Sequence, residues 1–296
     1  MFATFQFQEL IDRGLKEDIG TGDLSTSIMP EDLTGCAKIY AKQKGVVAGL
    51  LVVEQVFQSM DSHICIRRLF KEGDEVEVGD VVLELSGPLK SILQGERTAL
   101  NFLQHLSGIA TATRRAVDRV AGLSVRIVDT RKTLPGWRAL QKYAVRVGGG
   151  QNHRFGLYDS VMLKDNHLAA VGGLTEAVQQ IKAQVGHMMK IEVECETIEQ
   201  VHEAVVCGVD VIMLDNMDLV TMREAVLFID RRVLVEASGG MVEEHLREVA
   251  ETGVDLISMG ALTHSVQALD FSLDLGDIKA LTRASWQRDN LWQKKN

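Results

Sequence analysis

Residues 190–215 read KIEVECETIEQVHEAVVCGVDVIMLD, and this one stretch contains the repeating unit from which the fold can be inferred. Two apolar, β-branched runs, at 190–195 and 210–215, flank a segment with helical periodicity. Thr197 and Gln200 have the spacing of a capping box, which marks the start of a helix. Two strands joined through a helix are expected to lie parallel in one sheet, because parallel neighbours need a long crossover connection.

The same alternation of strand and helix extends over the second half of the chain. The predicted strands are Val125–Asp129, Ser160–Lys164, Lys190–Cys195, Asp210–Asp215, Val233–Ala237 and Asp255–Met259. The predicted helices are Arg138–Val147, Leu174–Val185, Thr197–Cys207, Leu219–Ile229 and Val242–Thr252. About six units are visible, fewer than the eight of a complete barrel. We therefore expect an α/β catalytic domain at 116–270 that forms an open or partial (β/α) barrel.

The first part of the chain has a different pattern and predicts a separate α/β domain at 1–115. The predicted helices here are Gln8–Lys16 and Glu96–Asp118, with short β-like stretches such as Ala37–Ala41 and Val76–Leu85 between them. Residues 71–83, KEGDEVEVGDVVL, resemble the hairpin of biotinyl and lipoyl carrier domains but lack a Met-Lys tip that could be modified. A structural role is therefore favoured for this domain, and residues 271–296 are expected to pack back onto it.

Composition and charge argue against several classes of protein. The formal net charge of −9 disfavours a nucleic-acid or membrane-surface binder, because either usually needs a basic face. The longest apolar run, 46–53, is too short to span a bilayer, and the N-terminus lacks the pattern of a signal peptide. Four cysteines without metal-ligand spacing are typical of reduced thiols. We expect a cytoplasmic protein with no nucleic-acid or membrane partner.

One segment is basic although the chain as a whole is acidic. Between Asp129 and Asp159 there is no acidic residue, while the basic residues in that interval are Arg131, Lys132, Arg138, Lys142, Arg146 and Arg154. A local excess of positive charge indicates an anion site. The Arg131-Lys132 and His153-Arg154 pairs offer charge-assisted contacts to carboxylates and phosphates. For the three cations within the predicted helix Arg138–Val147, a solvated helix face is favoured.

Polar, charged or glycine residues follow every predicted strand of the barrel. In such barrels the reactive residues lie at the C-terminal ends of the strands and in the loops beyond them. The sequences at these ends are Asp129-Thr-Arg-Lys132, Lys164-Asp-Asn-His167, Glu192-Val-Glu194, Met213-Leu-Asp-Asn216, Glu236-Ala-Ser-Gly-Gly240 and Ser258-Met-Gly260. Alternation along a strand places Glu192 and Glu194 on one face. Together these ends predict an active site.

The chemistry of these residues suggests their roles. The turn Ser238-Gly239-Gly240 precedes a helical pattern beginning near Met241, so its amides form a candidate phosphate cradle, which Gly260 and His264 could close from the other side. Glu194 and Asp215 are suited to hold Mg²⁺ or sugar hydroxyls, and the alternative for them is an ion pair with Lys164 or Arg131. The motifs of nucleotide kinases, nicotinamide dehydrogenases, zinc hydrolases and serine hydrolases are absent.

Several long motifs resemble those of quinolinate phosphoribosyltransferases. They are DTRKTLPGWR at 129–138, GGGQNHRFGLYD at 148–159, LKDNH at 163–167, EDIGTGDLST at 17–26, GERTALNF at 95–102, IEVE at 191–194, EASGG at 236–240 and GALTHS at 260–265. The similarity extends in the expected order from about residue 9 to residue 275. It implies an N-terminal α/β sandwich, a C-terminal open barrel, and a homodimer whose active sites are shared between subunits.

The resemblance also implies a reaction and a set of site residues. Quinolinate and phosphoribosyl pyrophosphate would react, with Mg²⁺ and without an organic cofactor, to give nicotinate mononucleotide, pyrophosphate and CO₂ for de novo NAD synthesis. The residues implied to face quinolinate are Arg131, His153, Arg154, Lys164 and, from the partner subunit, Arg97. Those implied to hold the donor are Lys132, Glu194, Asp215, Ser238, Gly239, Gly240, Gly260 and His264, with Thr130 and Ser258 also expected in the substrate site. Lys132, Lys164, Glu194 and Asp215 are the expected catalytic residues, and Glu194 and Asp215 are the expected metal ligands.

Three alternatives stay open at the level of sequence. A related phosphoribosyltransferase could use another acceptor, such as nicotinate, although one carboxylate needs fewer cations. A phosphosugar lyase or isomerase could use Lys164 as a Schiff-base nucleophile. A non-catalytic carrier could use the lipoyl-like segment at 71–83.

Overall fold

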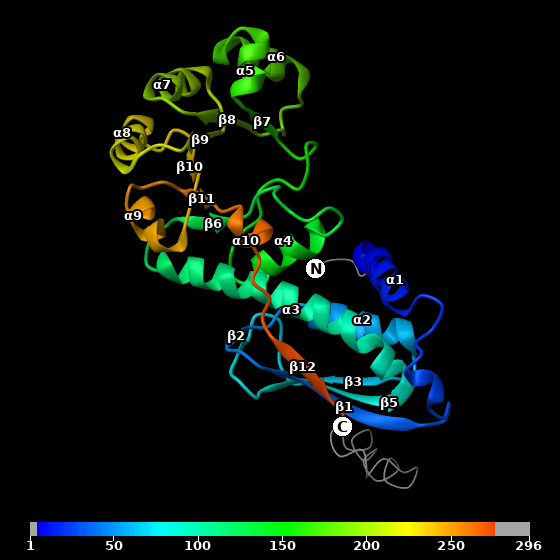
Figure 1. The fold of residues 1–296 in the computed structure, drawn as a ribbon. Coiled ribbons are helices and arrows are strands. Elements are labelled where there is room, and N and C mark those ends of the chain that lie inside the picture. Colours follow the sequence, from blue (N-terminus) through cyan, green and yellow to red (C-terminus); the bar gives the residue numbers. More distant parts are fainter. Residues whose placement is uncertain (1–4, 276–296) are drawn as a thin grey trace. The chain divides into compact units, whose positions relative to one another are not determined.

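The computed structural model describes residues 5–275, which fall into two compact units (Figure 1). The first unit contains the N-terminal part through Thr111, the segment Ala139–Gly148 and the C-terminal part from Val266. The second comprises Ala112–Arg138 and Gly149–Ser265. None of the helices among the described residues combines the length and the apolar character that crossing a membrane requires.

The first unit is built on an antiparallel sheet with the strand order β12-β1-β5-β3. The four strands are β1 (Thr34–Ala41), β3 (Cys65–Arg68), β5 (Val81–Pro88) and β12 (Phe271–Asp274). β12 pairs with β1, so the beginning of the C-terminal segment does join this unit, and residues 276–296 lie outside the described residues. Two further short strands, β2 (Gly45–Val46) and β4 (Glu75–Val76), form a separate antiparallel pair. β4 and β5 pair with different strands, which removes the basis for a lipoyl-type hairpin.

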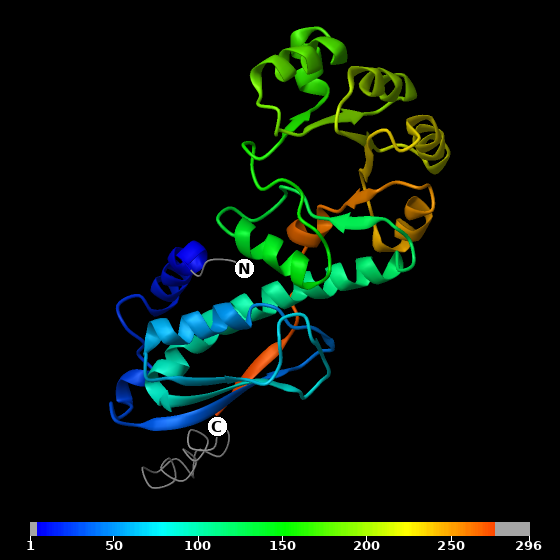
Figure 2. The same cartoon turned by 180° about the vertical axis from the view of Figure 1, so that it is seen from behind.

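Helices cover one face of this antiparallel sheet. In both views of the fold, α2 (Leu50–Met60) and the first part of α3 (Leu89–Arg119) lie along the same side of the strands (Figures 1 and 2). The unit also contains α1 (Phe5–Ile19) and the short 3₁₀ helix η1 (Thr26–Ile28). α2 begins within the apolar run at 46–53 because Gly49, at φ 103°, turns the chain out of β2. Most of its apolar side chains, such as Val53 and Phe57, are buried, whereas Leu51 is exposed.

The second unit contains a six-stranded parallel sheet with the order β6-β11-β10-β9-β8-β7. Its strands are β6 (Arg126–Val128), β7 (Val161–Leu163), β8 (Ile191–Cys195), β9 (Val211–Asp215), β10 (Leu234–Ser238) and β11 (Leu256–Ser258). β6 and β7 are the two edges and do not pair with each other, which leaves the barrel open. The prediction of an open α/β barrel with six strands is confirmed.

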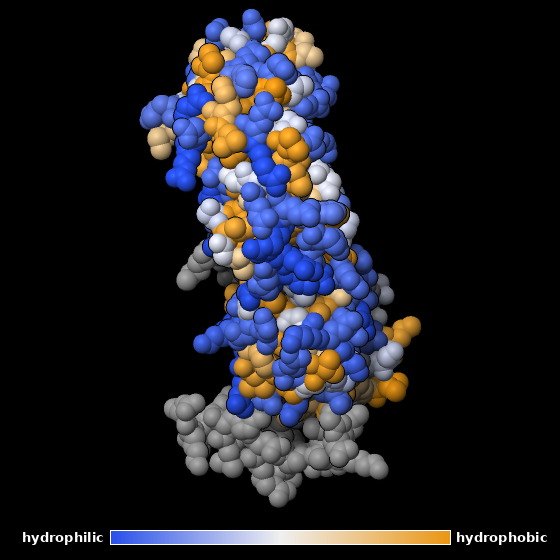
Figure 3. Space-filling view, turned by 90° about the vertical axis from the view of Figure 1, so that its left-hand side faces the viewer, coloured by the Kyte–Doolittle hydropathy of each residue, from blue (hydrophilic) through white to orange (hydrophobic). Residues whose placement is uncertain are grey.

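Helices α5 to α9 follow these strands on the outer side of the curved sheet, whereas α10 follows β11 on the side of the cavity (Figures 1 and 2). The bounds of these helices are α5 (Asp165–Val171), α6 (Leu174–Gln184), α7 (Ile198–Cys207), α8 (Leu219–Ile229), η2 (Glu243–His245), α9 (Leu246–Ala250) and α10 (Ala261–His264). The capping box predicted at Thr197 and Gln200 is present at the start of α7. On the side of the molecule in Figure 3, hydrophobic residues are scattered among hydrophilic ones, as is usual for a solvent-facing surface.

Helix α4 (Arg138–Val147) differs from the sequence-based expectation in its domain and in its environment. Residues 139–148 belong to the first unit, whereas the expected catalytic domain at 116–270 included them. Leu140 and Ala144 are buried, and Nε2 of Gln141 lies 2.9 Å from Nε2 of His105 on α3. Lys142 is fully buried, so the solvated-face interpretation is wrong for that residue. An amphipathic pattern identifies a buried helix face but not the core that the face packs against.

Candidate active site

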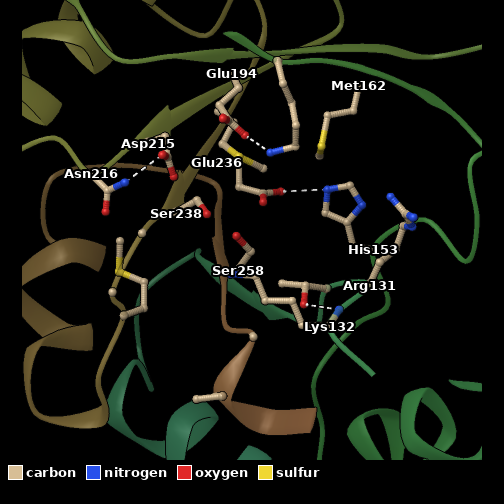
Figure 4. Close-up of a pocket in the computed structure, with 18 of the residues that line it drawn as sticks. Arg131, Lys132, His153, Met162, Glu194, Asp215, Asn216, Glu236, Ser238 and Ser258 are labelled. Carbon is tan, nitrogen blue, oxygen red and sulfur yellow. Dashed lines mark hydrogen bonds and ion pairs between the residues drawn. The ribbon is translucent and has the colours of Figure 1, made fainter. Parts of the chain in front are cut away.

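A cavity of about 630 Å³ opens at the C-terminal edge of the parallel sheet (Figure 4). The register of the strands explains why distant residues meet there. Ser238 pairs with Asp215 across β10 and β9, and Glu194 pairs with Met213 across β8 and β9. The predicted site residues that line the cavity are Thr130, Arg131, Lys132, His153, Arg154, Lys164, Glu194, Asp215, Ser238, Gly239, Gly240, Ser258, Gly260 and His264. The sequence therefore identified most of this cavity.

Arg97 is the predicted site residue that the cavity does not contain. It lies on α3 within the first unit, where its side chain is exposed. The neighbouring Glu96 is half-buried, which raises the pKa of its carboxyl group, while the positive charge of Arg97 acts in the opposite direction. Within the part of the chain that the structure describes, Arg97 therefore does not line the cavity of its own subunit.

One wall of the cavity carries cations. Lys164, at the end of β7, forms an ion pair with Glu194, at the end of β8, and this was one of the two alternatives for Glu194. Arg154 donates a hydrogen bond to the backbone oxygen of Ser160, 2.9 Å away. Burial, together with the neighbouring charge of Arg131, lowers the pKa of the Arg154 guanidinium. The two like charges repel each other, and an anion bound beside them would relieve that repulsion.

A buried group of one histidine and two glutamates lies at the floor of the cavity, which His153 and Glu236 line. Nε2 of His153 lies 3.1 Å from Oε2 of Glu192 and 3.6 Å from Oε2 of Glu236. The two carboxyl side chains are almost inaccessible to solvent, and each has an oxygen, Oε1, that no hydrogen bond from residues 5–275 satisfies. Burial, reinforced by the negative charge of Glu192, raises the pKa of Glu236 to about 7. One of these two acids is therefore readily kept neutral.

The backbone fixes which nitrogen of His153 carries a proton. The amide N–H of Arg154 donates to Nδ1 of His153 over 2.6 Å, so the neutral ring has its proton on Nε2, facing the glutamates. The buried Asp129 accepts bonds from the His153 amide (2.9 Å) and from the Asn152 side chain (2.6 Å), which holds this loop in place. Although the three groups are close enough to surround an ion, a protonated Nε2 cannot be a ligand, so this arrangement does not suit a metal.

Carboxylates at two other strand ends are better suited to a cation. Glu194 and Asp215 both line the cavity and are partly accessible, and their oxygens are hard ligands of the kind that Mg²⁺ prefers. Oδ2 of Asp215 accepts a bond from Nδ2 of Asn216 over 2.7 Å. Each carboxylate thus has one fixed partner and still faces the cavity.

The opposite wall contains glycine turns. Gly239 and Gly240, at φ 97° and 56°, follow β10. The helix predicted to begin near Met241 is wrong, because Val242 is extended and separates the turn from η2, and α9 begins only at Leu246. A phosphate at this turn would meet the amides of the turn rather than the N-terminus of a long helix.

A third glycine, Gly260, shapes the wall beside β11. A Cβ atom on Gly260 would lie 2.8 Å from Cδ of Lys132 and 3.1 Å from Cδ2 of His264, so any larger residue would displace the Lys132 side chain. The Thr263 hydroxyl donates to the backbone oxygen of Lys132 over 2.8 Å, which fixes the Lys132 loop against α10. The loops after β6 and β11 therefore form one packed unit.

Some lining residues were not assigned a role from sequence, although Met213, Asn216 and Glu236 belong to the strand ends that predicted the site. These lining residues are Met162, Met213, Asn216, Glu236, Met241, Val242 and Ala261. Glu236 interrupts the otherwise apolar strand β10, and a charged residue inside a buried strand was a usable signal. Asn216 stood in the sequence of a predicted strand end, but nothing in the pattern distinguished it from a solvated loop residue. The methionines carry no such signal, because methionine is an ordinary core residue.

Comparison with known proteins gives a consistent result. The N-terminal domain model of quinolinate phosphoribosyl transferase matches residues 23–107, and the C-terminal domain model matches residues 109–274. The chain is 46% identical over 270 residues to the probable nicotinate-nucleotide pyrophosphorylase [carboxylating] of Bacillus subtilis, with 91% of this chain and 93% of the relative covered. The corresponding Methanocaldococcus jannaschii protein is 43% identical over 277 residues, covering 90% and 96%.

Solved structures agree with these matches. The crystal structure of NadC from Streptococcus pyogenes superimposes with a TM-score of 0.90 at 42% identity, covering 93% of this chain and 97% of that one. The nicotinate-nucleotide pyrophosphorylase from Francisella tularensis gives a TM-score of 0.89 at 36% identity, covering 93% and 97%. With both domain models matched in order and relatives similar over nearly the whole length, the chain belongs to the quinolinate phosphoribosyl transferase family.

Proposed function

We propose that this enzyme transfers the phosphoribosyl group of phosphoribosyl pyrophosphate to quinolinate, releasing pyrophosphate and CO₂ and forming nicotinate mononucleotide for NAD synthesis. One observation supports the proposal independently of family membership. A single cavity collects Arg131, Lys132, Arg154 and Lys164 in a chain whose net charge is −9, and it also contains Glu194 and Asp215. Only substrates rich in negative charge would benefit from such a site.

Quinolinate suits the cationic wall. It brings two carboxylates, and Arg131, Arg154 and Lys164 offer donors for both, with Arg in the forked geometry that matches a carboxylate. The mutual repulsion of Arg131 and Arg154 decreases when a dianion binds beside them. His153, whose two nitrogens already have partners, would act by shaping this wall rather than by donating a proton to the acceptor.

The donor suits the glycine turns and the carboxylates. The amides of Ser238–Gly240 and the side chains of Lys132 and His264 would hold its phosphates. Glu194 and Asp215 would hold the ribose hydroxyls and, through oxygen ligands, Mg²⁺. When bound, Mg²⁺ neutralises the charge that develops on the leaving pyrophosphate.

The chemistry then follows from charge. As the bond to pyrophosphate breaks, the sugar carbon becomes electron-poor, and Glu194 and Asp215 stabilise that positive charge. The ring nitrogen of quinolinate donates its electron pair to this carbon and becomes a pyridinium. The carboxylate next to it leaves as CO₂, its bonding pair stays on the ring carbon beside the positive nitrogen, and that carbon then takes up a proton. No organic cofactor is required for any of these steps.

The proposal also covers the assembly of the enzyme, its location in the cell and the rejection of a Schiff-base mechanism. The enzyme works as a homodimer, in which Arg97 of a second copy reaches the quinolinate end of the cavity; the exposure of Arg97 on α3 supports this. Its proposed place of action is the cytoplasm. The Schiff-base alternative is disfavoured, because the Lys164 amine is engaged by Glu194.

An acceptor comparison tests the proposal against its rivals. Purified enzyme with phosphoribosyl pyrophosphate and Mg²⁺ should use quinolinate with a much higher kcat/KM than nicotinate, because a missing carboxylate leaves part of the cationic wall without its partner. Equal values for the two acceptors would refute the assignment of quinolinate. Borohydride trapping of a phosphosugar on Lys164 would instead support a lyase.

A further inference from the structure

Asn216, directly after β9, has a backbone conformation that residues other than glycine rarely adopt. Its φ is 55°, in the left-handed region, and among the described non-glycine residues only Asp230 and Arg231 share this feature. Asparagine adopts that region more readily than most residues, but the conformation still costs free energy. Of these three residues, Asn216 is the one that lines the cavity.

The contacts of Asn216 connect two parts of the site. Its Nδ2 atom donates to Oδ2 of Asp215 over 2.7 Å, and its backbone N–H donates to the oxygen of Ser238 over 3.0 Å. Figure 4 shows the Asn216 side chain beside Asp215, near Ser238. The bond to Nδ2 occupies one oxygen of the Asp215 carboxylate and leaves the other for a ligand.

The glycine turn is fitted closely to the same side chain. A Cβ atom on Gly239 would lie 2.2 Å from Oδ1 and 2.5 Å from Cγ of Asn216. The amide group of Asn216 is thus confined between the Asp215 carboxylate and the backbone of the turn. With the oxygen of Asn216 facing Gly239, its NH₂ group is directed at Asp215.

We propose that Asn216 is a positioning residue, which holds the Asp215 carboxylate in fixed register with the Ser238–Gly240 turn so that both contact the phosphoribosyl donor as one rigid unit. This inference rests on the proposed function for the identity of the donor. The left-handed backbone conformation of Asn216 then directs its side chain back toward the neighbouring Asp215.

Substitutions at Asn216 separate the amide from the backbone conformation. Asn216→Gly keeps access to the left-handed region and removes the amide, whereas Asn216→Asp keeps the size but replaces the NH₂ donor with an oxygen. Both should fold with a thermal midpoint close to that of the wild type. Both should raise the KM and the calorimetric Kd for phosphoribosyl pyrophosphate about 10-fold, the scale of one hydrogen bond to a charged group, while the KM for quinolinate changes less than about 2-fold.

A matched control and a structural readout complete the test. Asp230→Gly relieves the same kind of backbone strain ahead of β10, at the end of the strand opposite the cavity, and should change neither KM. In crystals of Asn216→Gly, the Asp215 side chain should adopt a different rotamer or several. The inference is overturned if Asp215 stays in place, or if it moves and the donor KM does not change.

The outcomes distinguish this inference from the proposed function. A wild-type enzyme that neither binds phosphoribosyl pyrophosphate nor converts quinolinate contradicts the proposed function, and the position of Asp215 in the two crystal structures then still decides whether Asn216 orients it. An active wild type with an Asn216→Gly variant of unchanged donor affinity contradicts only the inference.

Discussion

Nε2 of His153 lies 3.1 Å from Oε2 of Glu192, and this contact fixes the histidine ring between two buried acids at the floor of the cavity. The amide of Arg154 occupies the other ring nitrogen, so His153 has no free nitrogen for a substrate. The resemblance to the family implied that His153 faces the quinolinate carboxylates. The geometry favours a supporting role, in which His153 and Asp129 hold the loop that carries Arg154.

Replacing Glu236 should change how stability depends on pH. Because burial raises the pKa of Glu236 to about 7, the folded protein holds a proton that the unfolded chain releases above its ordinary pKa of 4.5. The stability contributed by that proton is present below about pH 4.5 and is lost as the pH rises through about 7. Glu236→Gln should therefore be more stable than the wild type at pH 8 by about 1–3 kcal/mol, with little difference at pH 4.5.

Urea unfolding of both proteins at a series of pH values measures this difference. The difference between the two unfolding free energies should grow with pH over that window and level off above it. A constant difference across the window would mean that Glu236 ionises normally in the folded state.

Replacing Gly260 should weaken donor binding without unfolding the protein. Its backbone conformation is ordinary, so Gly260→Ala adds only a methyl group, which would overlap Cδ of Lys132 at 2.8 Å. The displaced Lys132 should raise the KM for phosphoribosyl pyrophosphate about 10-fold, the scale of an overpacked contact. Gly186→Ala is a matched control, because no atom lies within 4 Å of the added methyl group. Equal KM values for the two variants would count against a donor role for Lys132.

Removing either cavity carboxylate should slow the chemical step. Glu194→Ala or Asp215→Ala should lower kcat by roughly 10²–10³-fold, the usual scale for losing one electrostatic stabiliser. Single-turnover measurements at saturating substrates separate this loss from a loss of binding. Near-normal kcat in both variants would leave these acids as ion-pair and hydrogen-bond partners of Lys164 and Asn216 only.

Arg97 tests whether active sites are shared between subunits. Arg97→Ala should fold and dimerise normally, because its exposed side chain contributes at most ~1 kcal/mol to stability. It should nevertheless lose most activity, because the active site of the other subunit would lack this arginine. Mixing it with Lys164→Ala should restore part of the activity, because each mixed dimer has one site with both lesions and one intact site. Tagged subunits confirm that exchange has occurred. If mixed dimers form and activity does not recover, Arg97 does not act across the interface.

The sequence predicted the parallel sheet and most of its cavity because these depend on local patterns. The strand ends combine apolar β-branched runs with polar termini, and one parallel register brings those termini to one edge. Arg131, Lys164 and Asp215 could therefore be identified without coordinates.

The remaining features depend on tertiary contacts. The unit to which α4 belongs depends on which core receives Leu140 and Ala144, and no periodicity encodes that. α5, with seven residues, is too short for a helical period to be recognised. The role of Asn216 depends on the close approach of Gly239, which only the folded chain brings next to it.

Labelled quinolinate tests the central claim most directly. The wild-type enzyme is incubated with phosphoribosyl pyrophosphate, Mg²⁺ and quinolinate carrying ¹⁴C in the carboxylate beside the ring nitrogen, and both products are measured. The account predicts that labelled CO₂ and nicotinate mononucleotide appear in equal amounts, and that neither appears when the donor is omitted or Mg²⁺ is chelated. Nicotinate mononucleotide without labelled CO₂, labelled CO₂ without the donor, or no product from an enzyme shown to be folded would contradict it.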